Sequence, residues 1–505
     1  MKKILNKFDL LKVIQRLKKE RKKIVLCHGV FDLIHLGHIN HFKKAKEYGD
    51  ILIVSITRDI FVKKGFNRPY FNETQRLKFL DNVEIIDYIY LCASESAEDS
   101  INLIKPNFYI KGQDYKNNKL DKTKKIYYEK KLLAKFNGKI IYTNEESYSS
   151  ATILNENFPV FNEEQRLFID KLRKDFSYST IKNIFNELSK LKVLVIGEAI
   201  IDRYNFGKVL GKSSKEPYFS FVSKYIEEYY GGSLAICNNI SDFVKKIDIL
   251  TSLEKNKENL KILSNFSKSN KVIFNFNPKN IFKTIIKERF IDHISLYKIF
   301  GNYKISEIQE DSFYKNLRKI ILSKCSKYDI VIVSDYSHGL LDNVCSKTIC
   351  NKSNFLSVNT QLNSSNIGFH TVNKYKNFDL LVVNESELRQ ELRDNLSDII
   401  FLGKKIKLKN KIKNIIITQG SNGVLYLDKN NKIYRCPAFA SSVKDKVGAG
   451  DAMLAMASIL LKINTDPNLL LFLSSIASAK IVENFGNKNS VKLSELDRFV
   501  EYTFK

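Results

Sequence analysis

The sequence predicts the α/β fold class, with two doubly wound parallel-sheet domains in one chain of 505 residues. Apolar segments of strand length alternate with helix-patterned segments along both halves, which is typical of parallel sheets covered by helices on both faces. Near the start, His35-Leu36-Gly37-His38 follows an apolar segment, and near the end Val447-Gly448-Ala449-Gly450-Asp451 opens an apolar helix. A chain of this length exceeds one ordinary core, so we expect each turn in a domain of its own.

The composition favours a globular protein of the cytoplasm. Hydrophobic residues make up 44% of the chain, and no apolar run approaches the roughly 20 residues of a membrane helix. The charged start has no apolar segment with a cleavage site behind it. The seven cysteines are scattered without a C-x-x-C pair, which predicts reduced thiols rather than disulfides or a zinc site.

The formal charge of +28 raises nucleic-acid binding as an alternative function. The lysines are spread along the chain, however, with only short clusters such as Lys18-Lys19 and Lys22-Lys23. A diffuse excess of charge is weaker evidence than a clustered basic stripe. We therefore expect small-molecule partners, with no nucleic acid and no membrane, and the charge would help to attract anionic nucleotides.

The first domain is expected over residues 1–158. Residues 8–23 have helical apolar spacing and predict a leading helix. Two later helices are expected at residues 39–48 and 72–80. The expected strands are residues 24–26, 50–56, 87–91, 108–110 and 139–142.

The second domain is expected over residues 191–505, after a linker. Residues 159–190 are polar and helix-prone, which predicts that this linker is helical. Alternation of apolar and polar residues over 218–230 predicts a small β lid beside the main sheet. The strands expected in the main sheet are residues 192–197, 329–333, 355–358, 380–383 and 414–417.

The first turn predicts a binding site for a nucleoside triphosphate. Residues 27–38 run as strand, glycine turn, loop and helix start, and a helix N-terminus favours anions. His35 and His38 are three residues apart there, and Gly37 permits close approach of a phosphate to the backbone. A local hydrogen-bond network between two histidines is the alternative interpretation.

This segment resembles the cytidylyltransferase-like nucleotidylyltransferases. It carries their G-x-F-D-x-x-H-x-G-H element at residues 29–38, a basic loop at 62–69, an arginine helix at 72–77, and further elements at 105–115 and 147–153. The resemblance implies that a substrate phosphate attacks the α-phosphorus of a triphosphate and releases pyrophosphate, through positioning and charge stabilisation. A class I tRNA synthetase carries similar histidines, but it would need a larger body and a tRNA-binding region.

The resemblance also implies roles for individual residues of the first domain. The catalytic group would be His35, His38 and Lys63, with Lys63 and Arg76 as phosphate clamps. Asp32 or Asp114 would orient the substrate or the base. Nucleotide contacts are expected from Gly29, Phe31, Gly37, Arg76, Ser149, Ser150 and Thr152.

The second turn predicts another anion site. Gly448, Ala449 and Gly450 open an apolar helix with small residues, which leaves their backbone N–H groups accessible to an anion. Asp451 stands at the helix start, where a carboxylate can act as a general base. A helix-start turn without a function is the alternative interpretation.

Residues 191–505 resemble the ribokinase-like (PfkB) sugar kinases. Elements similar to those of the family occur in family order at residues 197–202, 231–232, 384–387 and 418–423, and residues 334–339 are similar to a D-Y-x-K-G element. The resemblance implies ATP-dependent phosphorylation of a sugar hydroxyl, with Asp451 as the base and Mg²⁺ bridging ATP oxygens.

The roles implied for the second domain divide into sugar and nucleotide contacts. The sugar contacts would be Asp202, Gly231, Gly232 and Asp335. Glu387 would hold a metal-bound water beside Mg²⁺. The nucleotide contacts would be Asn384, Glu387, Thr418, Gly420, Gly423, Gly448, Ala449 and Gly450.

Three positions depart from the kinase pattern on the sugar side. Ala235 replaces an asparagine, His338 replaces the lysine of D-Y-x-K-G, and Asn359 stands where an aspartate is common. We expect His338 to replace the lysine only when the imidazole is protonated. These departures bear on the identity of the sugar and not on the type of reaction.

The pairing of the two segments resembles the bifunctional ADP-heptose synthase-like proteins, with the domain order reversed. It implies a homo-oligomeric enzyme that phosphorylates a sugar phosphate and transfers a nucleotidyl group to a sugar phosphate, using ATP and Mg²⁺. A CTP-dependent transferase that makes a CDP-polyol or CDP-sugar is one alternative. A kinase-like half that only binds a sugar ligand and regulates is another.

Overall fold

The computed structural model describes residues 3–62, 69–112, 125–143, 161–212, 215–259, 264, 271–305, 310–363, 366–367 and 371–504. The chain divides into two compact units, Met1–Asn162 and Glu163–Lys505. Each unit has its own sheet and its own core, as the two-domain α/β prediction requires.

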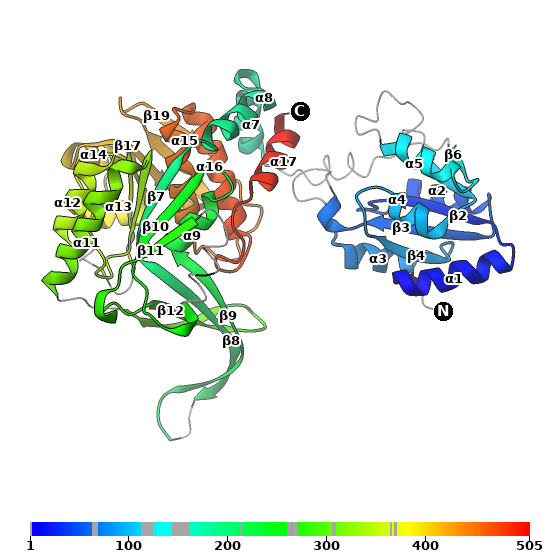
Figure 1. Cartoon of the computed structure of the whole chain (residues 1–505), viewed down its shortest axis with the longest axis horizontal. Coiled ribbons are helices and arrows are strands. Elements are labelled where there is room, and N and C mark those ends of the chain that lie inside the picture. The colour runs from blue at the N-terminus through cyan, green and yellow to red at the C-terminus, as the bar shows by residue number, and fades with distance from the viewer. Residues whose placement is uncertain are drawn as a thin grey trace. The chain divides into compact units, whose positions relative to one another are not determined.

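The first unit is built on a six-stranded parallel sheet in the order β1-β4-β3-β2-β5-β6 (Figure 1). The chain winds outward from β2 through β3 to β4, and then crosses back to β5 and β6. The carboxyl ends of β2 and β5 therefore form a topological switch point, where open α/β sheets bind ligands. The elements are β1 (Ile4–Leu5), α1 (Lys7–Lys19), β2 (Ile24–Gly29), α2 (Leu36–Lys46), β3 (Ile51–Thr57), α3 (Glu73–Asp81), β4 (Tyr88–Cys92), α4 (Glu98–Ile104), β5 (Phe108–Gly112), α5 (Lys125–Ala134) and β6 (Lys139–Thr143).

Helices cover both faces of this sheet because alternate strand residues point to opposite faces. Leu26 belongs to the cluster beneath α1, α4 and α5, whereas Val25 and Cys27 belong to the cluster beneath α2 and α3. Local signals set the helix starts. Asn72, for example, forms a capping box with Gln75 at the start of α3.

The second unit contains a nine-stranded sheet in the order β11-β10-β7-β14-β15-β16-β17-β18-β19. The strands are parallel up to β17, and β18 and β19 are antiparallel. The strands are β7 (Lys192–Gly197), β10 (Lys246–Thr251), β11 (Lys271–Asn275), β14 (Ile330–Asp335), β15 (Leu356–Thr360), β16 (Phe378–Asn384), β17 (Ile412–Thr418), β18 (Val424–Leu427) and β19 (Ile433–Cys436). The helices are α9 (Ser233–Ile240), α11 (Asp311–Lys324), α12 (Asn343–Lys352), α13 (Glu385–Leu392), α14 (Ile399–Asn410), α15 (Ala449–Lys462), α16 (Pro467–Val482) and α17 (Leu493–Phe504).

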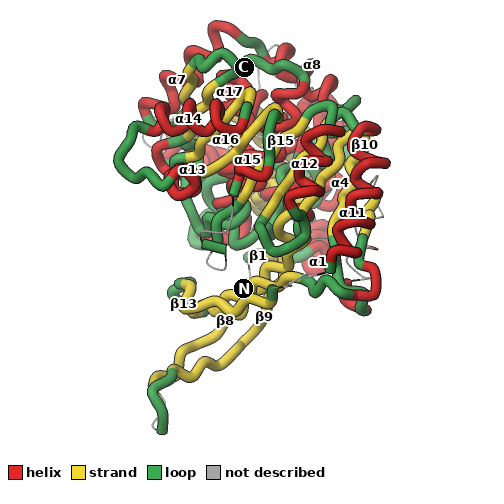
Figure 2. The backbone as a smooth tube through the Cα atoms, turned by 90° about the vertical axis from the view of Figure 1, so that its left-hand side faces the viewer, coloured by secondary structure: helices red, strands yellow, loops and turns green. Residues whose placement is uncertain are grey.

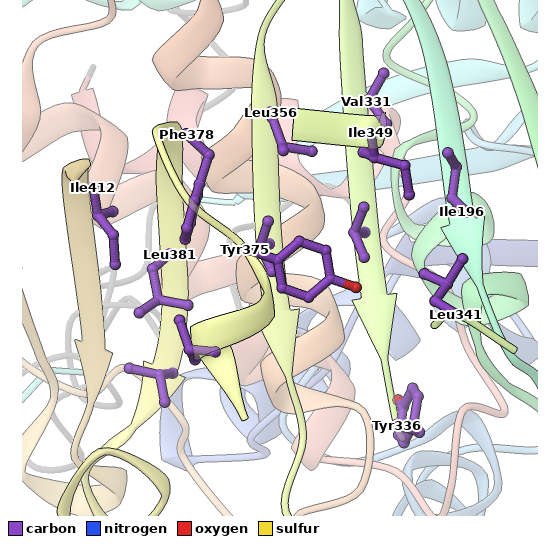
Figure 3. Close-up of a cluster of buried hydrophobic side chains, with 14 of the residues drawn as sticks. Ile196, Val331, Tyr336, Leu341, Ile349, Leu356, Tyr375, Phe378, Leu381 and Ile412 are labelled. Carbon is purple, nitrogen blue, oxygen red and sulfur yellow. The ribbon is translucent and has the colours of Figure 1, made fainter. Parts of the chain in front are cut away.

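The hydrophobic core of the second unit holds the strands whose ends carry polar side chains of the predicted site. Figure 3 shows side chains of neighbouring strands, among them Ile196, Val331, Leu356 and Leu381, in one buried cluster. The helix α15 is buried at every residue from Asp451 to Leu460, which matches its apolar composition around the whole circumference.

A separate four-stranded sheet forms the lid of the second unit, in the order β13-β12-β8-β9. The strands β8 (Ala199–Lys212) and β9 (Phe219–Gly232) form a long antiparallel ribbon that extends away from the nine-stranded sheet (Figures 1 and 2). The strand β12 (Ile285–Asp292) pairs in parallel with β8 and antiparallel with β13 (Lys298–Lys304). The predicted lid is therefore larger than expected, because β12 and β13 join the expected segment.

The segment expected as a helical linker contains α7 (Glu163–Asp175) and α8 (Tyr178–Leu188), and both helices belong to the second unit. The Arg173 Nε donates to the Thr503 carbonyl at 2.5 Å, and the Tyr178 hydroxyl donates to Asp497 at 3.1 Å. Each helix carries a buried apolar stripe that needs a partner surface. The described part of this segment is therefore packed structure of the second unit and not a free-standing connector.

Two predictions from composition have direct structural counterparts. All seven cysteines are free thiols, and six of them are buried. None of the helices that the structure describes is long and apolar enough to cross a membrane.

Candidate active sites

The histidine turn of the first unit begins at the carboxyl end of β2, at the switch point. His35 is the N-cap of α2, and its Nδ1 accepts the Gly37 backbone N–H at 3.1 Å. The His35 and His38 ring centroids are 4.0 Å apart, and the Phe31 ring lies edge-on to His38 at 5.4 Å. A Cβ at Gly29 would meet the Phe31 ring at 3.1 Å, so the missing side chain of Gly29 leaves room for that ring. The structure thus brings these predicted residues together at the N-terminus of α2.

Partial burial lowers the pKa of His35 from its usual value. A neutral imidazole carries one N–H donor and one acceptor nitrogen. Because the acceptor nitrogen of His35 binds the Gly37 amide, the other nitrogen carries the proton in the neutral ring. Together with the helix N-terminus, this arrangement favours an anionic group such as a phosphate.

Asp32, predicted to orient the substrate or the base, has partners within the protein. Its side chain is buried, and its two carboxylate oxygens accept the backbone N–H groups of Tyr70 at 2.8 Å and Phe71 at 2.9 Å. Asp32 therefore fastens the segment that leads into α3 to the loop after β2.

Arg76, predicted as a phosphate clamp, makes several contacts within the protein. Its side chain is fully buried, and its guanidinium donates to the carbonyls of Phe71, Val30 and Thr57 and to the Asp59 carboxylate at 2.5–3.0 Å. Every nitrogen of the guanidinium thus has a protein partner. Arg76 holds the loops after β2 and β3 together and positions the histidine turn from behind.

Five predicted site residues of the first unit lie outside the described residues: Lys63, Asp114, Ser149, Ser150 and Thr152. Their roles stay predictions.

A buried cation near the switch point was not singled out from the sequence. Lys111 of β5 is buried, and its Nζ lies 3.6 Å from Glu129 Oε2. Glu129 also accepts the Tyr109 hydroxyl at 3.0 Å. Burial and the charge of Lys111 lower the pKa of His41 on α2 to about 4. Lys111 therefore adds positive potential beside α2, where an anionic ligand is expected.

The centre of the second site is Asp451, in the first turn of α15. Its side chain is buried, and both of its oxygens accept the Tyr336 hydroxyl, at 3.0 and 3.1 Å. Burial raises the pKa of Asp451 to about 7, the Tyr336 hydrogen bond opposes that rise, and the charge of Asp202 adds to it. A carboxylate with a pKa near neutrality is matched to general-base work.

The turn before Asp451 depends on Gly448. This residue has φ of 86°, and a Cβ there would overlap Asn487 Oδ1. Gly450, by contrast, has nothing within 4 Å of its missing side chain. Gly448 therefore makes a left-handed turn, and Gly450 leaves open space at the position of its missing side chain, while the predicted anion site stays a prediction.

Asp202 of β8 lies beside the two glycines that were predicted as its companions. Its Oδ1 accepts Arg289 Nη1 at 2.6 Å, and a Cβ at Gly231 would overlap its Oδ2. Gly232 has φ of 60° and passes close to the Glu198 carbonyl. Asp202, Gly231 and Gly232 are thus one structural group, held by a lid arginine that the sequence interpretation missed.

A second lid cation, Lys287 of β12, was also missed. Its side chain is 5% exposed, and its Nζ lies 4.8 Å from the centroid of the Tyr336 ring. Burial lowers the pKa of Lys287 to about 8, although the charge of Asp202 acts in the opposite direction. Lys287 and Arg289 are two residues apart, on the same face of the strand as the buried Ile285 and Ile291. Cations on the apolar face of a strand are the signal that could have found them.

Asp335, predicted to bind the sugar, is engaged by its own unit. Its Oδ1 accepts the Ser337 backbone N–H at 2.9 Å, and its Oδ2 accepts the Tyr375 hydroxyl at 2.6 Å and Lys374 Nζ at 2.5 Å. These bonds give Asp335 the role of an anchor for the loop after β14.

Glu198 organises the same loop from the other side. It is fully buried and accepts the backbone N–H groups of Tyr336, His338 and Leu340 at 3.0–3.4 Å. Burial and the charge of Asp335 raise the pKa of Glu198 to about 7. Tyr336 therefore reaches Asp451 from a loop that both Asp335 and Glu198 hold in place.

The three departures from the kinase pattern have structural explanations. His338 is 4% exposed, and burial followed by the charge of Lys287 lowers its pKa to about 4. The imidazole is therefore neutral near neutral pH, and the expectation that it replaces a lysine only when protonated stays a prediction. Asn359 donates to the Val382 carbonyl at 2.8 Å, and Ala235 is buried within α9.

Glu387 and Asn384 form a capping box at the start of α13. Glu387 Oε2 accepts the Asn384 backbone N–H at 2.9 Å, and Glu387 Oε1 accepts that of Leu362 at 3.2 Å. Burial raises the pKa of Glu387 to about 7, and its charge in turn raises the pKa of Asp451. Across the described ranges, no group of three or more His, Cys, Asp or Glu residues is arranged to hold a metal ion.

The remaining predicted nucleotide contacts lie in the turn between β17 and β18. Thr418 ends β17, Gly420 has φ of 61° with open space around it, and Gly423 has φ of 83°. A Cβ at Gly423 would overlap the Cys436 carbonyl of β19. The two glycines allow a tight turn at this end of the sheet.

Family comparisons assign the same two classes to these two parts of the chain. Residues 26–157 match the model of the cytidylyltransferase-like family. Residues 311–491 match the model of the pfkB family of carbohydrate kinases. A cytidylyltransferase-like segment therefore precedes a pfkB segment in one polypeptide, in agreement with the two resemblances found in the sequence.

Particular relatives match a part of this chain. The chain is similar to the bifunctional protein HldE of Nitratiruptor sp., with 38% identity over 112 residues, 22% of this chain and 24% of that protein. It is 41% identical to the bifunctional protein HldE of Campylobacter jejuni over 117 residues, 23% of this chain and 25% of that protein. The chain thus spans about a quarter of the length of these relatives. Phosphofructokinase-2 of Escherichia coli, solved with substrates and products, aligns with 62% of this chain and all of its own at a TM-score of 0.50 and 12% identity, which shows a shared fold.

Proposed function

We propose that the chain is a bifunctional enzyme. Its second unit phosphorylates a sugar or sugar phosphate with ATP, and its first unit transfers a nucleotidyl group to a sugar phosphate and releases pyrophosphate. The single observation that carries the kinase half is the buried Asp451 at a glycine-rich helix start, with its carboxylate oriented by Tyr336. The product would be a nucleotide sugar of the ADP-heptose kind.

In the kinase reaction, Asp451 accepts the proton of the sugar hydroxyl while that oxygen attacks the γ-phosphorus. The bond from phosphorus to the bridging oxygen breaks, and ADP leaves. The backbone N–H groups at Gly448–Gly450 lie at the start of α15, where they stabilise negative charge on the transferred group. When bound, Mg²⁺ supplies neutralisation of charge across the phosphate oxygens of ATP.

In the transferase reaction, a phosphate oxygen of the sugar phosphate attacks the α-phosphorus, and pyrophosphate leaves. His35 and His38 would bind the triphosphate at the N-terminus of α2, and Lys111 would add positive potential. No side chain is covalently modified, so the catalytic effect comes from orientation and charge.

The nucleotide and the sugar belong to this proposal. The relatives named as bifunctional proteins, together with the two family matches, support a nucleotidyltransferase joined to a sugar kinase, and ATP is the nucleotide that we propose for both. A CTP-dependent transferase that makes a CDP-polyol is the second candidate, since the matching family is named for cytidylyl transfer. A kinase-like half that only binds sugar would not need a base whose pKa is near 7, so Asp451 speaks against that alternative.

The decisive experiment uses the full chain with a panel of sugar phosphates and either ATP or CTP, and reads the products by mass spectrometry. We expect His38→Ala to abolish pyrophosphate release while sugar phosphorylation continues, and Asp451→Asn to do the reverse. Each variant is the control for the other. Loss of both activities in either variant, or no product with any sugar phosphate, would count against the bifunctional assignment.

We further propose a cytoplasmic homo-oligomer that associates through the lid. The four-stranded lid and the turn before β9 expose large apolar side chains, and these include Leu210, Tyr218, Phe219, Val222, Tyr225, Ile226, Ile299 and Phe300. Exposed patches of this kind mark interaction surfaces. Light scattering after size exclusion should give a mass above that of one chain, and Phe219→Glu should reduce it. A monomeric wild-type chain contradicts this part of the proposal.

A further inference from the structure

The loop after α16 carries an amide side chain to which the protein gives no partner. Both polar atoms of the Asn487 side chain, Oδ1 and Nδ2, are inaccessible to solvent. Neither atom has a hydrogen-bond partner among the residues that the structure describes. A buried polar group without a partner costs about 1–3 kcal/mol, so most buried polar groups are paired. The Asn487 side chain is therefore an exception, and its missing partner points to a ligand.

Asn487 lies against the glycine turn that opens α15. A Cβ at Gly448, the N-cap residue of α15, would overlap Asn487 Oδ1. Asp445 fixes this position, because its Oδ2 accepts the Gly486 backbone N–H at 3.2 Å and its Oδ1 accepts that of Val447 at 3.1 Å. One buried carboxylate thus holds the residue before Asn487 beside the residue before Gly448.

The rest of the turn has its own hydrogen bonds. Ser478 Oγ of α16 donates to the Ala449 carbonyl at 3.1 Å, and the Ala452 N–H donates to the Gly448 carbonyl at 3.0 Å. The helices α15 and α16 also pack side by side (Figures 1 and 2). The turn is therefore held without the Asn487 amide, whose two N–H donors have no acceptor in the described part of the chain.

An anion at the start of α15 would supply that acceptor. The first N–H groups of a helix have no intrahelical acceptor, and they favour negative charge. Gly450 has nothing within 4 Å of its missing side chain, so there is open space at this turn. An amide can present either its NH₂ group or its oxygen, and an anion selects the NH₂ group. The Asn487 side chain thus complements the backbone donors of the turn.

We infer that Asn487 is a further catalytic residue of the kinase site, and that its Nδ2 donates a hydrogen bond to an oxygen of the phosphoryl group in transfer. The inference rests on the proposed kinase function and deepens it. In that reaction the sugar oxygen bonds to the γ-phosphorus, the bond to the bridging oxygen of ADP breaks, and the proton passes to Asp451. Asn487 forms and breaks no covalent bond. It stabilises the negative charge on the phosphoryl oxygens.

The first test is nucleotide binding by the full chain, which needs no turnover. Calorimetry compares ADP with a non-hydrolysable ATP analogue, in a His38→Ala background that weakens binding by the first unit. Asn487→Ala should lower the affinity for the analogue by about 10-fold or more and leave that for ADP unchanged, because only the γ-phosphate loses a donor. Asn487→Asp keeps the shape but replaces the donor by a carboxylate, so it should weaken analogue binding further. Asn484→Ala is the matched control, since the Asn484 amide of the same loop already donates to the Lys480 carbonyl at 3.1 Å.

Stability and turnover separate this role from a structural one. Because Asn487→Ala removes an unpaired amide, it should lower the melting temperature measured without nucleotide no more than Asn484→Ala does. Its turnover with any sugar that the product panel identifies should fall by about 10²-fold, the usual effect of losing one donor to a developing charge. The KM for that sugar should stay unchanged.

Three results would overturn the inference. They are equal affinities of the wild type and Asn487→Ala for the analogue, including no binding by either, equal losses for ADP and the analogue, and analogue binding by Asn487→Asp that matches the wild type. Failure of the kinase proposal is seen separately, as absence of phosphoryl transfer to every sugar while Asn487→Ala still distinguishes the analogue from ADP.

Discussion

The Tyr336 hydroxyl donates to both carboxylate oxygens of Asp451, at 3.0 and 3.1 Å, and so joins the loop after β14 to the start of α15. The two residues are 115 positions apart in sequence. Their bond fixes the direction in which the carboxylate points and stabilises its charged form. The loop that presents Tyr336 is itself held by Glu198 and Asp335, so the orientation of Asp451 depends on both of these carboxylates.

Replacement of Asp451 by Asn should reduce kinase turnover by about 10²–10⁴, the usual contribution of a general base. The affinity for ATP should change little, because the glycine turn before α15 remains. Single-turnover kinetics and nucleotide binding measured on the same preparation separate the two effects. Wild-type turnover in this variant would remove Asp451 from the role.

The kinase activity should have a narrow optimum in pH. Asp451, with a pKa of about 7, must lose its proton to act as a base, so kcat/KM should rise as pH increases through about 7. Lys287, with a pKa of about 8, keeps its positive charge beside the site only below that pH, so activity should fall as pH increases through about 8. The charges of Asp202, Glu198, Glu387 and Arg289 act on this pair. A flat profile between pH 6 and 9 would be inconsistent with these assignments.

Replacement of Tyr336 by Phe should shift the acidic limb of that profile upward. The Tyr336 hydrogen bond lowers the pKa of Asp451, so its removal lets burial raise the pKa further above about 7. Tyr314→Phe is the matched control, since the Tyr314 hydroxyl donates to the Gly339 carbonyl of the same loop at 2.8 Å but does not contact Asp451. The expected result is a displaced limb for Tyr336→Phe alone, measured by kcat/KM against pH.

Replacement of Arg76 by Lys should destabilise the first unit by ~2–4 kcal/mol, because several buried acceptors lose their donors at once. An ammonium cannot reach Phe71, Val30, Thr57 and Asp59 together as the guanidinium does. Arg58→Lys, at an exposed neighbouring position, should change stability by less than about 0.5 kcal/mol. Urea unfolding followed by circular dichroism compares them. Equal stability with weakened triphosphate binding would instead restore the phosphate-clamp interpretation.

Replacement of Gly231 by Ala should impair the sugar side of the kinase site. The new Cβ would overlap Asp202 Oδ2, so the carboxylate must move away from Arg289. We expect kcat/KM for the sugar to fall by at least ~10-fold, about 1.4 kcal/mol, while the KM for ATP is retained. Gly301→Ala in β13 is the control, because its Cβ would meet the Tyr303 ring at 3.2 Å and the Glu288 carbonyl oxygen at 3.4 Å without overlap. Equal kinetics of the two variants would show that Asp202 tolerates the displacement.

Much of the fold could be predicted because buried parallel strands are continuous apolar runs. The strand expected at residues 192–197 is β7 (Lys192–Gly197), and the one expected at 414–417 lies inside β17 (Ile412–Thr418). The strand β12 was missed because Lys287, Glu288 and Arg289 interrupt its apolar pattern. Lys287 and Arg289 lie beside the candidate site, so the apolar pattern failed next to that site.

The motif residues at the turns were also predictable, because close backbone approach demands glycine at fixed spacing. The protein contacts of Asp32, Arg76 and Asp335 were not predictable. A charged residue in a motif can bind a ligand or anchor a loop, and the sequence alone does not show which neighbours it has in the fold. Glu198 is the clearest example. In the sequence it is a single acidic residue after a strand, yet its carboxylate accepts three backbone N–H groups of a loop 138–142 residues away.

The capping box of Asn384 and Glu387 has a consequence for how such chains diverge. At the first turn of α13, the side chain of each residue accepts a hydrogen bond from the backbone N–H of the other. The pair therefore stabilises the helix whether or not a nucleotide is ever bound. A descendant that had lost catalysis would still be under selection to keep N-x-x-E for stability. Persistence of that motif is therefore poor evidence of a working kinase. Asp451 contributes a buried charge at a cost to folding, so we expect its replacement to come first.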